Sequence, residues 1–285
     1  MRAALIACGL FWTASTAPAT PVSAAEATPP QVIKLERFRK ALWTVSVTVN
    51  GKTGRFFLDT GGGRTLLETE FAKGVDCRFW GRTTGFNMFG EPGSGPRCDQ
   101  AAIASGQVAL TSADVGVIDW GDRWGADRKP DGLLSLDAFD GKVITLDQAA
   151  ATLTLETDES LARRVATATE VPLRLARECS GACLTVFMGV PTKAGMAWLT
   201  LDSGAGGVSL IAKDYAELFG LRPERQEQRL VYEVAPGIVA DSPVVVADMI
   251  MDGNLGQPFL SRHVVTLDLA HARAWIASSN GARRP

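Results

Sequence analysis

The chain has 285 residues, of which 46% are hydrophobic and 21% are charged, as is typical of a globular protein with a sizeable core. Its formal net charge is −2, from 29 basic and 31 acidic residues. This balance, without a basic run, argues against nucleic acid or an anionic membrane surface as a partner. The length is enough for two lobes of ordinary domain size.

The first 25 residues have the pattern of a secretory signal peptide. Arg2 supplies the positive charge, residues 3–12 form a short apolar stretch, and residues 22–25 are a small-residue cleavage site. The apolar stretch is too short for a membrane anchor, and we expect no later segment to span a membrane. We therefore expect a periplasmic or secreted protein once residues 1–25 are removed, with a polar leader over residues 26–39.

Removal of the signal peptide, which contains Cys8, leaves Cys77, Cys98, Cys179 and Cys183. An even number of cysteines in an exported chain favours disulfides, and three pairings are possible. Proximity in the sequence favours Cys77–Cys98 and Cys179–Cys183. The alternative is a four-cysteine zinc site, although the spacing lacks the paired Cys-x-x-Cys motifs that such sites prefer.

Short apolar runs and dense turn signals predict a chain made mostly of strands. In the first half, the expected elements are a strand at 43–49, a turn at Asn50-Gly51, a returning strand at 55–58, a short helix at 66–74, a long glycine-rich hairpin or loop at 80–98, strands at 101–110 and 113–120, and a hairpin from 143–147 and 152–155. In the second half, they are a linker helix at 157–169, a strand at 184–190, a strand over 198–201, a short helix at 211–220, strands at 229–234 and 243–250, and a strand at 264–268.

One sequence motif occurs twice: an apolar strand that ends in an aspartate and a glycine-containing turn. It appears as Asp59-Thr60-Gly61 and again as Asp202-Ser203-Gly204. Burying an unpaired carboxylate is costly, so this pattern is an odd choice for stability alone. A second segment, Val-Ile-Thr-Leu-Asp at 143–147, returns almost unchanged at 264–268. Two repeats in the same order indicate an internal duplication, and the two acids suggest one carboxylate-pair site built from both copies.

With these motifs, the sequence resembles the pepsin and retropepsin superfamily of aspartic proteases over residues 40–278. The resemblance implies an all-β fold in which two homologous retropepsin-like β-barrel lobes of one chain enclose a cleft. The expected N-terminal lobe is 40–156, the linker 157–172 and the C-terminal lobe 173–279, with a tail at 280–285.

The resemblance further implies an aspartic endopeptidase that uses no cofactor and no metal. Its two acids would share one proton and activate a water that attacks a peptide or protein substrate bound in the cleft. The residues implied for the site are the catalytic acids Asp59 and Asp202, the turn-supporting residues Thr60, Gly61, Ser203 and Gly204, and the flap residues Phe86, Met88, Phe89 and Gly90.

The sequence departs from the family pattern near the expected site. Gly62 and Ala205 stand where pepsins place a hydroxyl residue that hydrogen-bonds the acid, Ser135 replaces a glycine, and Asn254 interrupts an apolar pair. The flap region at 83–96 has no tyrosine. A missing hydroxyl donor leaves a carboxylate less stabilised, so we expect the first ionisation of the dyad, and with it the activity window, at higher pH than in pepsin-type sites.

Other interpretations of these residues remain open at this level. A non-catalytic peptide-binding protein on the same fold is the main alternative, and a homodimer in which each chain supplies one acid is a weaker one. Two motifs in one chain favour a monomer. Asp147 and Asp268 are predicted to be turn formers. The two histidines have no serine- or zinc-hydrolase motif around them.

Overall fold

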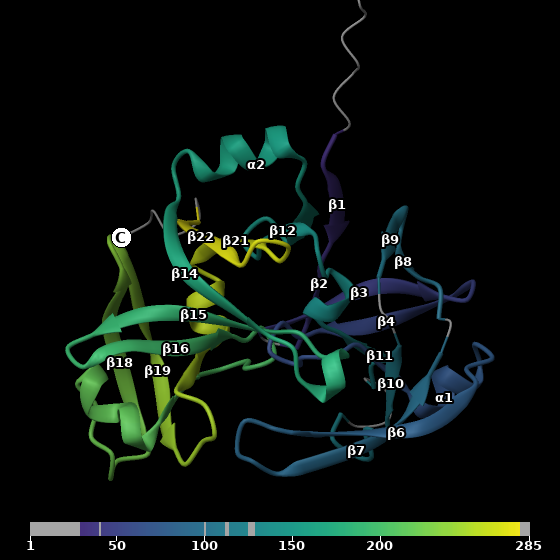
Figure 1. Ribbon diagram of the computed structural model, residues 1–285, viewed down its shortest axis with the longest axis horizontal. Coiled ribbons are helices and arrows are strands. Elements are labelled where there is room, and N and C mark those ends of the chain that lie inside the picture. Colours follow the sequence, from purple (N-terminus) through teal and green to yellow (C-terminus); the bar gives the residue numbers. More distant parts are fainter. Residues whose placement is uncertain (1–28, 40, 100, 112–113, 125–128, 280–285) are drawn as a thin grey trace, which may run out of the picture.

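The computed structural model describes residues 29–279 except 40, 100, 112–113 and 125–128. The predicted signal peptide at 1–25 and the tail at 280–285 lie outside the described residues. Within them, the protein is built mostly from strands, which form two lobes side by side (Figure 1).

The first lobe, on the right of Figure 1, is built around one sheet. Its strands are β2 (Glu36–Phe38), β3 (Leu42–Val49), β4 (Lys52–Leu58), β5 (Leu66–Glu68), β6 (Phe79–Phe86), β7 (Pro92–Cys98), β8 (Ile103–Ser105), β9 (Val108–Leu110), β10 (Val115–Ile118) and β11 (Gly132–Leu134). They lie in the order β6-β7-β10-β5-β11-β4-β3-β8-β9, with β2 paired to β3. Alternate residues of β3, such as Val45 and Val47, are fully buried in the core, as its alternating sequence predicts.

A second sheet runs between the lobes and continues through the second lobe. Its strands are β1 (Gln31–Lys34), β12 (Val143–Asp147), β13 (Thr152–Leu155), β14 (Thr169–Ala176), β15 (Thr185–Thr192), β16 (Gly195–Leu201), β17 (Ser209–Ala212), β18 (Glu227–Ala235), β19 (Ile238–Ala247), β20 (Gly253–Leu255), β21 (His263–Asp268) and β22 (Arg273–Ser278). Their order is β1-β13-β12-β21-β22-β14-β15-β16-β20-β17-β19-β18.

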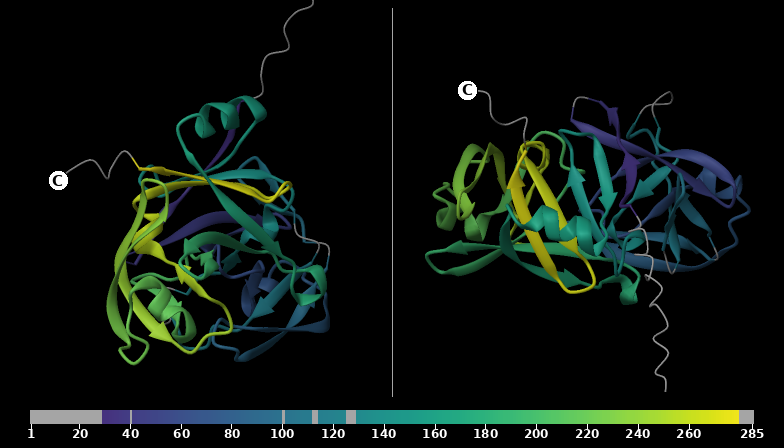
Figure 2. Two further views of the ribbon diagram at one scale, coloured as in Figure 1. Left: turned by 60° about the vertical axis from the view of Figure 1, so that its left-hand side comes forward. Right: turned by 90° about the horizontal axis from the view of Figure 1, so that it is seen from above.

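The helices are short. They are the α-helices α1 (Thr69–Lys73), α2 (Asp158–Val165) and α3 (Gln257–Leu260), and the 3₁₀ helices η1 (Leu136–Ala138), η2 (Cys179–Gly181) and η3 (Lys213–Phe219). Helix α2 is the predicted linker helix; a reciprocal capping box between Thr157 and Ser160 begins it. It lies over the outer face of the sheet that joins the lobes (Figure 1 and Figure 2).

The prediction of an all-β, two-lobed chain is confirmed, but the sheets are not closed into barrels. In the described part of the chain, each sheet has two free ends, at β6 and β9 and at β1 and β18. In the second sheet, β14 pairs with β22 through Thr169–Pro172 and with β15 through Leu173–Ala176. This one strand therefore continues from the sheet between the lobes into the second lobe.

The segment expected to be a separate leader is partly a strand. Residues Gln31–Lys34 form β1, which pairs antiparallel with β13. Ile33 is buried in the core while its neighbours in β1 are exposed, so one apolar side chain anchors the edge of the sheet. The expectation of a leader separate from the folded protein is therefore wrong for these residues.

The repeated segments meet each other at the centre of the molecule. Strands β12 and β21 pair antiparallel about Thr145 and Thr266, whose hydroxyl groups lie 2.9 Å apart. This pairing sets the two copies about an approximate two-fold axis. As predicted, Asp147 and Asp268 accept backbone N–H bonds in the turns that follow these strands.

Two disulfides link segments of the chain close to the β6–β7 hairpin. Cys77–Cys98 ties the segment after α1 to the end of β7, and Cys179–Cys183 closes the loop that contains η2. This pairing confirms the one favoured by the sequence and leaves no free thiols among these four for zinc. Disulfides are typical of exported proteins. No helix within the described residues is long and apolar enough to cross a membrane.

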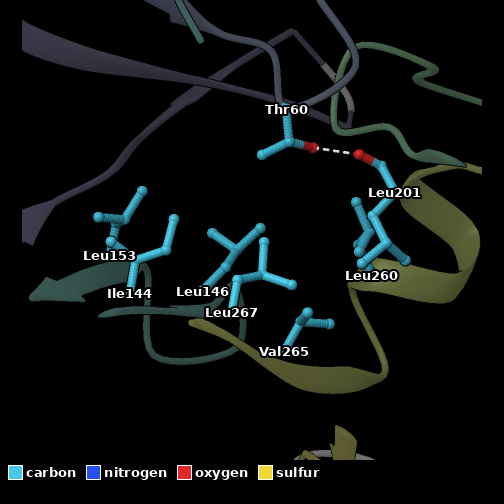
Figure 3. A pocket seen from close by; sticks show the side chains of 8 residues that line it. All are labelled: Thr60, Ile144, Leu146, Leu153, Leu201, Leu260, Val265 and Leu267. Carbon is cyan, nitrogen blue, oxygen red and sulfur yellow. Dashed lines mark hydrogen bonds between the residues drawn. The ribbon is translucent and has the colours of Figure 1, made fainter. Parts of the chain in front are cut away.

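A small apolar cavity of about 10 Å³ lies between the two aspartate turns and the central sheet, which is the part of the second sheet formed by β12, β13 and β21 (Figure 3). It is lined by residues of both halves: Thr60, Ile144, Leu146, Leu153, Leu201, Leu260, Val265 and Leu267. Figure 3 shows Thr60 above the leucine and isoleucine side chains of the central sheet. A space of this size is at the lower limit for one water molecule, and its walls are apolar. The aspartate turns therefore pack closely against a hydrophobic layer.

We expect Leu267→Ala to lower the free energy of unfolding by about 2–5 kcal/mol, because it removes buried methyl groups and enlarges this cavity. The matched control is Val264→Ala, a half-buried residue of the same strand that does not line the cavity. Urea unfolding monitored by tryptophan fluorescence measures both. Equal losses of unfolding free energy in the two variants would show that the hydrophobic layer beneath the turns is packed no more tightly than the rest of the strand.

Candidate active site

Each aspartate turn begins where an apolar strand ends beside a parallel neighbour. Strand β4 pairs in parallel with β11, and β16 pairs in the same way with β20. The backbone N–H of Asp59 donates to the carbonyl of Leu134, and that of Asp202 donates to the carbonyl of Leu255, both at 3.0 Å. The two halves therefore hold their acids by the same backbone contacts.

The turns are locked to each other by reciprocal hydrogen bonds. The backbone N–H of Thr60 donates to Ser203 Oγ, and that of Ser203 donates to Thr60 Oγ1, each at 3.0 Å. The Thr60 hydroxyl then donates to the carbonyl of Leu201 at 2.6 Å, and the Ser203 hydroxyl to that of Leu58 at 2.9 Å. All of these groups are buried, so the network fixes one turn rigidly against the other.

This lock brings the carboxyl groups of Asp59 and Asp202 within hydrogen-bond reach of each other. The glycine of each turn packs against the acid of the other. A Cβ on Gly61 would lie 2.8 Å from Asp202 Oδ1, and one on Gly204 would lie 2.6 Å from Asp59 Oδ2. Neither glycine has a positive φ, so these positions require glycine because of the close approach of the opposite carboxyl group.

The surroundings of the two acids differ. Asp202 Oδ1 accepts the backbone N–H groups of Gly204 and Ala205 at 2.8 and 3.1 Å, and its Oδ2 accepts Asn254 Nδ2 at 2.7 Å. Asp59 Oδ1 accepts the backbone N–H of Gly61 at 3.0 Å, and the carboxyl group of Asp59 also accepts the backbone N–H of Gly62, so the side-chain donor Asn254 is what distinguishes Asp202. Burial raises the pKa of both acids, and the nearby charge of Asp202 raises the pKa of Asp59 further, well above its usual range.

The comparisons with known proteins agree with this geometry. Residues 45–138 match the family of aspartyl proteases. Among solved structures, the aspartic proteinase from Irpex lacteus superposes with a TM-score of 0.53 at 13% identity, covering 90% of this chain and 99% of its own. Conglutin gamma, a basic 7S globulin from lupine seeds, gives a TM-score of 0.54 at 10% identity, covering 88% of this chain and 95% of its own. Curated protein sequences gave no match.

The fold is that of the pepsin-like aspartic proteases. Both lobes, and not the first alone, take part in the superposition, since it covers nine tenths of the chain. In this pepsin-like fold, the residues that the sequence singled out at Asp59 and Asp202 lie together at the junction of the lobes.

Asn254 was read from the sequence as an interruption of an apolar pair, and its contact with Asp202 was missed. It is fully buried, and its Oδ1 accepts the backbone N–H of Leu210 at 2.7 Å. The expectation that both acids lack a side-chain donor is therefore wrong for Asp202. Only the register of β16 against β20 brings Asn254 to the acid, and the sequence does not reveal that register.

Two other contacts near the pair of acids were not predicted. The buried carboxylate of Asp137 accepts the backbone N–H and the hydroxyl of Thr65 at 2.9 and 2.6 Å, and burial raises the pKa of Asp137 to about 6. Arg64, just after the first turn, forms a buried ion pair with Asp114, which also binds Arg97 of β7. These contacts connect the first aspartate turn to η1 and to the base of the β6–β7 hairpin.

The β6–β7 hairpin is the predicted flap, and it reaches across to the second lobe (Figure 1). At its tip, the carbonyl of Met88 accepts the backbone N–H of Ile250 at 3.1 Å. Gly90 lies against the Ile250 side chain, since a Cβ there would be 3.0 Å from it. Phe86 and Phe89 are 68% and 47% exposed and are not part of the core.

Proposed function

We propose that the protein is an aspartic endopeptidase whose catalytic acids are Asp59 and Asp202. The observation that carries the proposal is the pair of carboxyl groups within hydrogen-bond reach, at the point where two hydrogen-bonded turns meet. Two such groups cannot both ionise cheaply, so they share one proton. A peptide-binding protein would need neither acid, and it would not need glycines that leave room for them.

The shared proton determines the chemistry of the pair. The ionised acid accepts a proton from a water molecule, whose oxygen attacks the carbonyl carbon of the peptide bond. The protonated acid donates to the carbonyl oxygen, and a tetrahedral diol forms. Proton transfer to the amide nitrogen then allows the C–N bond to break. Thr60 and Ser203 would hold both acids in register during these steps.

The test is incubation of the purified protein with a diverse pool of peptides, followed by mass spectrometry of the fragments. We expect new internal cuts with the wild type and none with Asp59→Asn. Cuts of equal rate in both proteins would come from a contaminant or from another site. Intact peptides in both, across pH 3 to 8, would favour the peptide-binding alternative.

The proposal extends to the setting in which the enzyme acts. We propose that it is an exported monomer, with lobes at 40–156 and 173–279, that cleaves peptide or protein substrates between them. The disulfides fit an oxidising compartment, and the presence of both acids in one chain makes a partner chain unnecessary.

The hairpin tip, with Phe86, Met88, Phe89 and Gly90, is proposed to act as a substrate flap. Two observations support this role: Phe86 and Phe89 are exposed, and the carbonyl of Met88 accepts the backbone N–H of Ile250 in the second lobe. Closing this surface over a peptide would exclude water from the reacting bond.

We expect Met88→Ser combined with Phe89→Ser to raise KM about tenfold or lower kcat comparably, because apolar contacts with the substrate are lost. The thermal midpoint should stay within about 2 °C, since surface substitutions change stability little. Phe79→Ser is the matched control, because Phe79 is 40% exposed at the opposite end of β6. Steady-state kinetics with a cleaved peptide measures the effect. A matching loss of thermal stability in the double variant would place these residues in the core instead.

A further inference from the structure

We propose that Asn254 sets the ionisation of the pair, so that Asp202 is the ionised acid that accepts the proton of the attacking water and Asp59 is the protonated one. This inference rests on the proposed function, and it assigns distinct roles to two acids that the function alone leaves equivalent. Asn254 contacts Asp202 and not the reacting atoms, and is therefore a positioning residue.

The orientation of the Asn254 side chain follows from its partners. The backbone N–H of Leu210 can only donate a hydrogen bond, so the amide oxygen of Asn254 must face it, at 2.7 Å. The amide NH₂ group then faces Asp202 Oδ2, at 2.7 Å. This group can only donate, and the Asn254 side chain is fully buried. It therefore favours a carboxylate at Asp202 over a carboxylic acid whose O–H points toward it.

The matching place in the first half has no donor. Asn254 pairs with Thr200 across the parallel strands β20 and β16, and Leu133 pairs with Phe57 in the same way across β11 and β4. Leu133 carries only methyl groups toward the first turn; a Cβ on Gly62 would lie 3.0 Å from its Cδ2. The two halves thus differ at one register position, an amide beside Asp202 and an isobutyl group beside Asp59.

The charged groups around the pair do not reverse this difference. The titratable group facing each acid is the other acid. Of the charged residues on neighbouring elements, Arg64 is directed to Asp114, and Asp137 is directed to Thr65. The directions of the pKa shifts agree with the geometry, because burial raises both while that of Asp59 is raised further by the charge of Asp202.

The roles that follow balance over one turnover. Asp202 takes a proton from the water as the new C–O bond forms, and the carbonyl oxygen takes the proton of Asp59 as its π bond breaks. In the second step, Asp202 gives its proton to the amide nitrogen, the C–N bond breaks, and a hydroxyl of the diol returns a proton to Asp59. Asp202 ends ionised and Asp59 protonated, as they began.

The first measurement needs no substrate. The protein labelled with ¹³C at the aspartate carboxyl carbons is titrated by NMR, with the two signals assigned from Asp59→Asn and Asp202→Asn. We expect the Asp202 carbon to ionise at the lower pH. The variant Asn254→Leu has the residue that the first half carries at the matching position, Leu133. In it, the lower of the two pKa values of the pair should rise by about one pH unit, since one charge-assisted hydrogen bond is lost. Adding Leu133→Asn to that variant should move the first ionisation to Asp59.

The second measurement is the pH profile of kcat/KM. In Asn254→Leu, the acid limb of the profile should move to higher pH by the same amount as the pKa measured by NMR, and adding Ala205→Ser should bring it back. A structural role alone would lower kcat/KM equally at every pH. An Asp59 carbon that ionises first in the wild type, or dyad values unmoved by Asn254→Leu, would overturn the assignment. Wild-type protein that cuts no peptide would refute the proposed function, while the NMR result still decides the role of Asn254.

Discussion

Asp59→Asn and Asp202→Asn are each expected to lower kcat for peptide cleavage by about 10³-fold or more while leaving the fold intact. Asparagine has nearly the shape of aspartate, but it can neither accept the proton of a water nor share one with its partner. The cross-turn bonds of Thr60 and Ser203 do not involve the carboxyl groups, so they persist in both variants. Single-turnover assays and thermal melts measure the two quantities.

The two acids form one unit, and so the double variant should be no slower than either single one. The matched control is Asp147→Asn, which makes the same substitution at an aspartate whose carboxylate accepts the backbone N–H of Ala150 in a turn. We expect its activity to be unchanged. Losses that multiply in the double variant, or a single variant with substantial activity, would show that the acids act separately or not at all.

Gly204→Ala is expected to lower kcat/KM about 10²-fold or more, because its new Cβ would lie 2.6 Å from Asp59 Oδ2 and would displace that carboxyl group. The crowding should also cost about 1–3 kcal/mol of unfolding free energy. Gly61→Ala should act in the same way on Asp202, since the two turns pack crosswise.

Gly207→Ala is the matched control for this prediction. Gly207 lies in the same loop as Gly204, it has no positive φ, and a Cβ there would meet nothing within 4 Å. We expect near wild-type activity and stability. Kinetics and urea unfolding of the three variants provide the measurement. An active Gly204→Ala protein would show that the acids do not lie as close to the opposite turns as the structure places them.

Much of this fold was predictable because the duplication repeats local patterns. The repeated Val-Ile-Thr-Leu-Asp segment predicted β12 and β21 and their turns, and the glycine-rich stretch at 80–98 is the hairpin of β6 and β7. Both disulfides join cysteines near each other in the sequence. In each of these cases, the residues that determine the structure are neighbours along the chain.

The parts that were missed depend on residues far apart in the sequence. Strand β1 is stabilised by β13, about 120 residues away, and its four residues were too few to indicate a strand from the sequence. Asn254 reaches Asp202 only through the register of two parallel strands. The need for Gly61 and Gly204 comes from the opposite lobe rather than from their own turns. Local patterns do not contain this information.

The central claim is that one chain supplies both acids of one catalytic pair. The most direct test is to incubate the peptide pool with an equimolar mixture of the Asp59→Asn and Asp202→Asn proteins, and in parallel with the wild type. The claim predicts cuts by the wild type and none by the mixture, since no molecule in the mixture has both acids. Cuts by the mixture at a substantial fraction of the wild-type rate would mean that each site takes its acids from two chains, and would contradict the account.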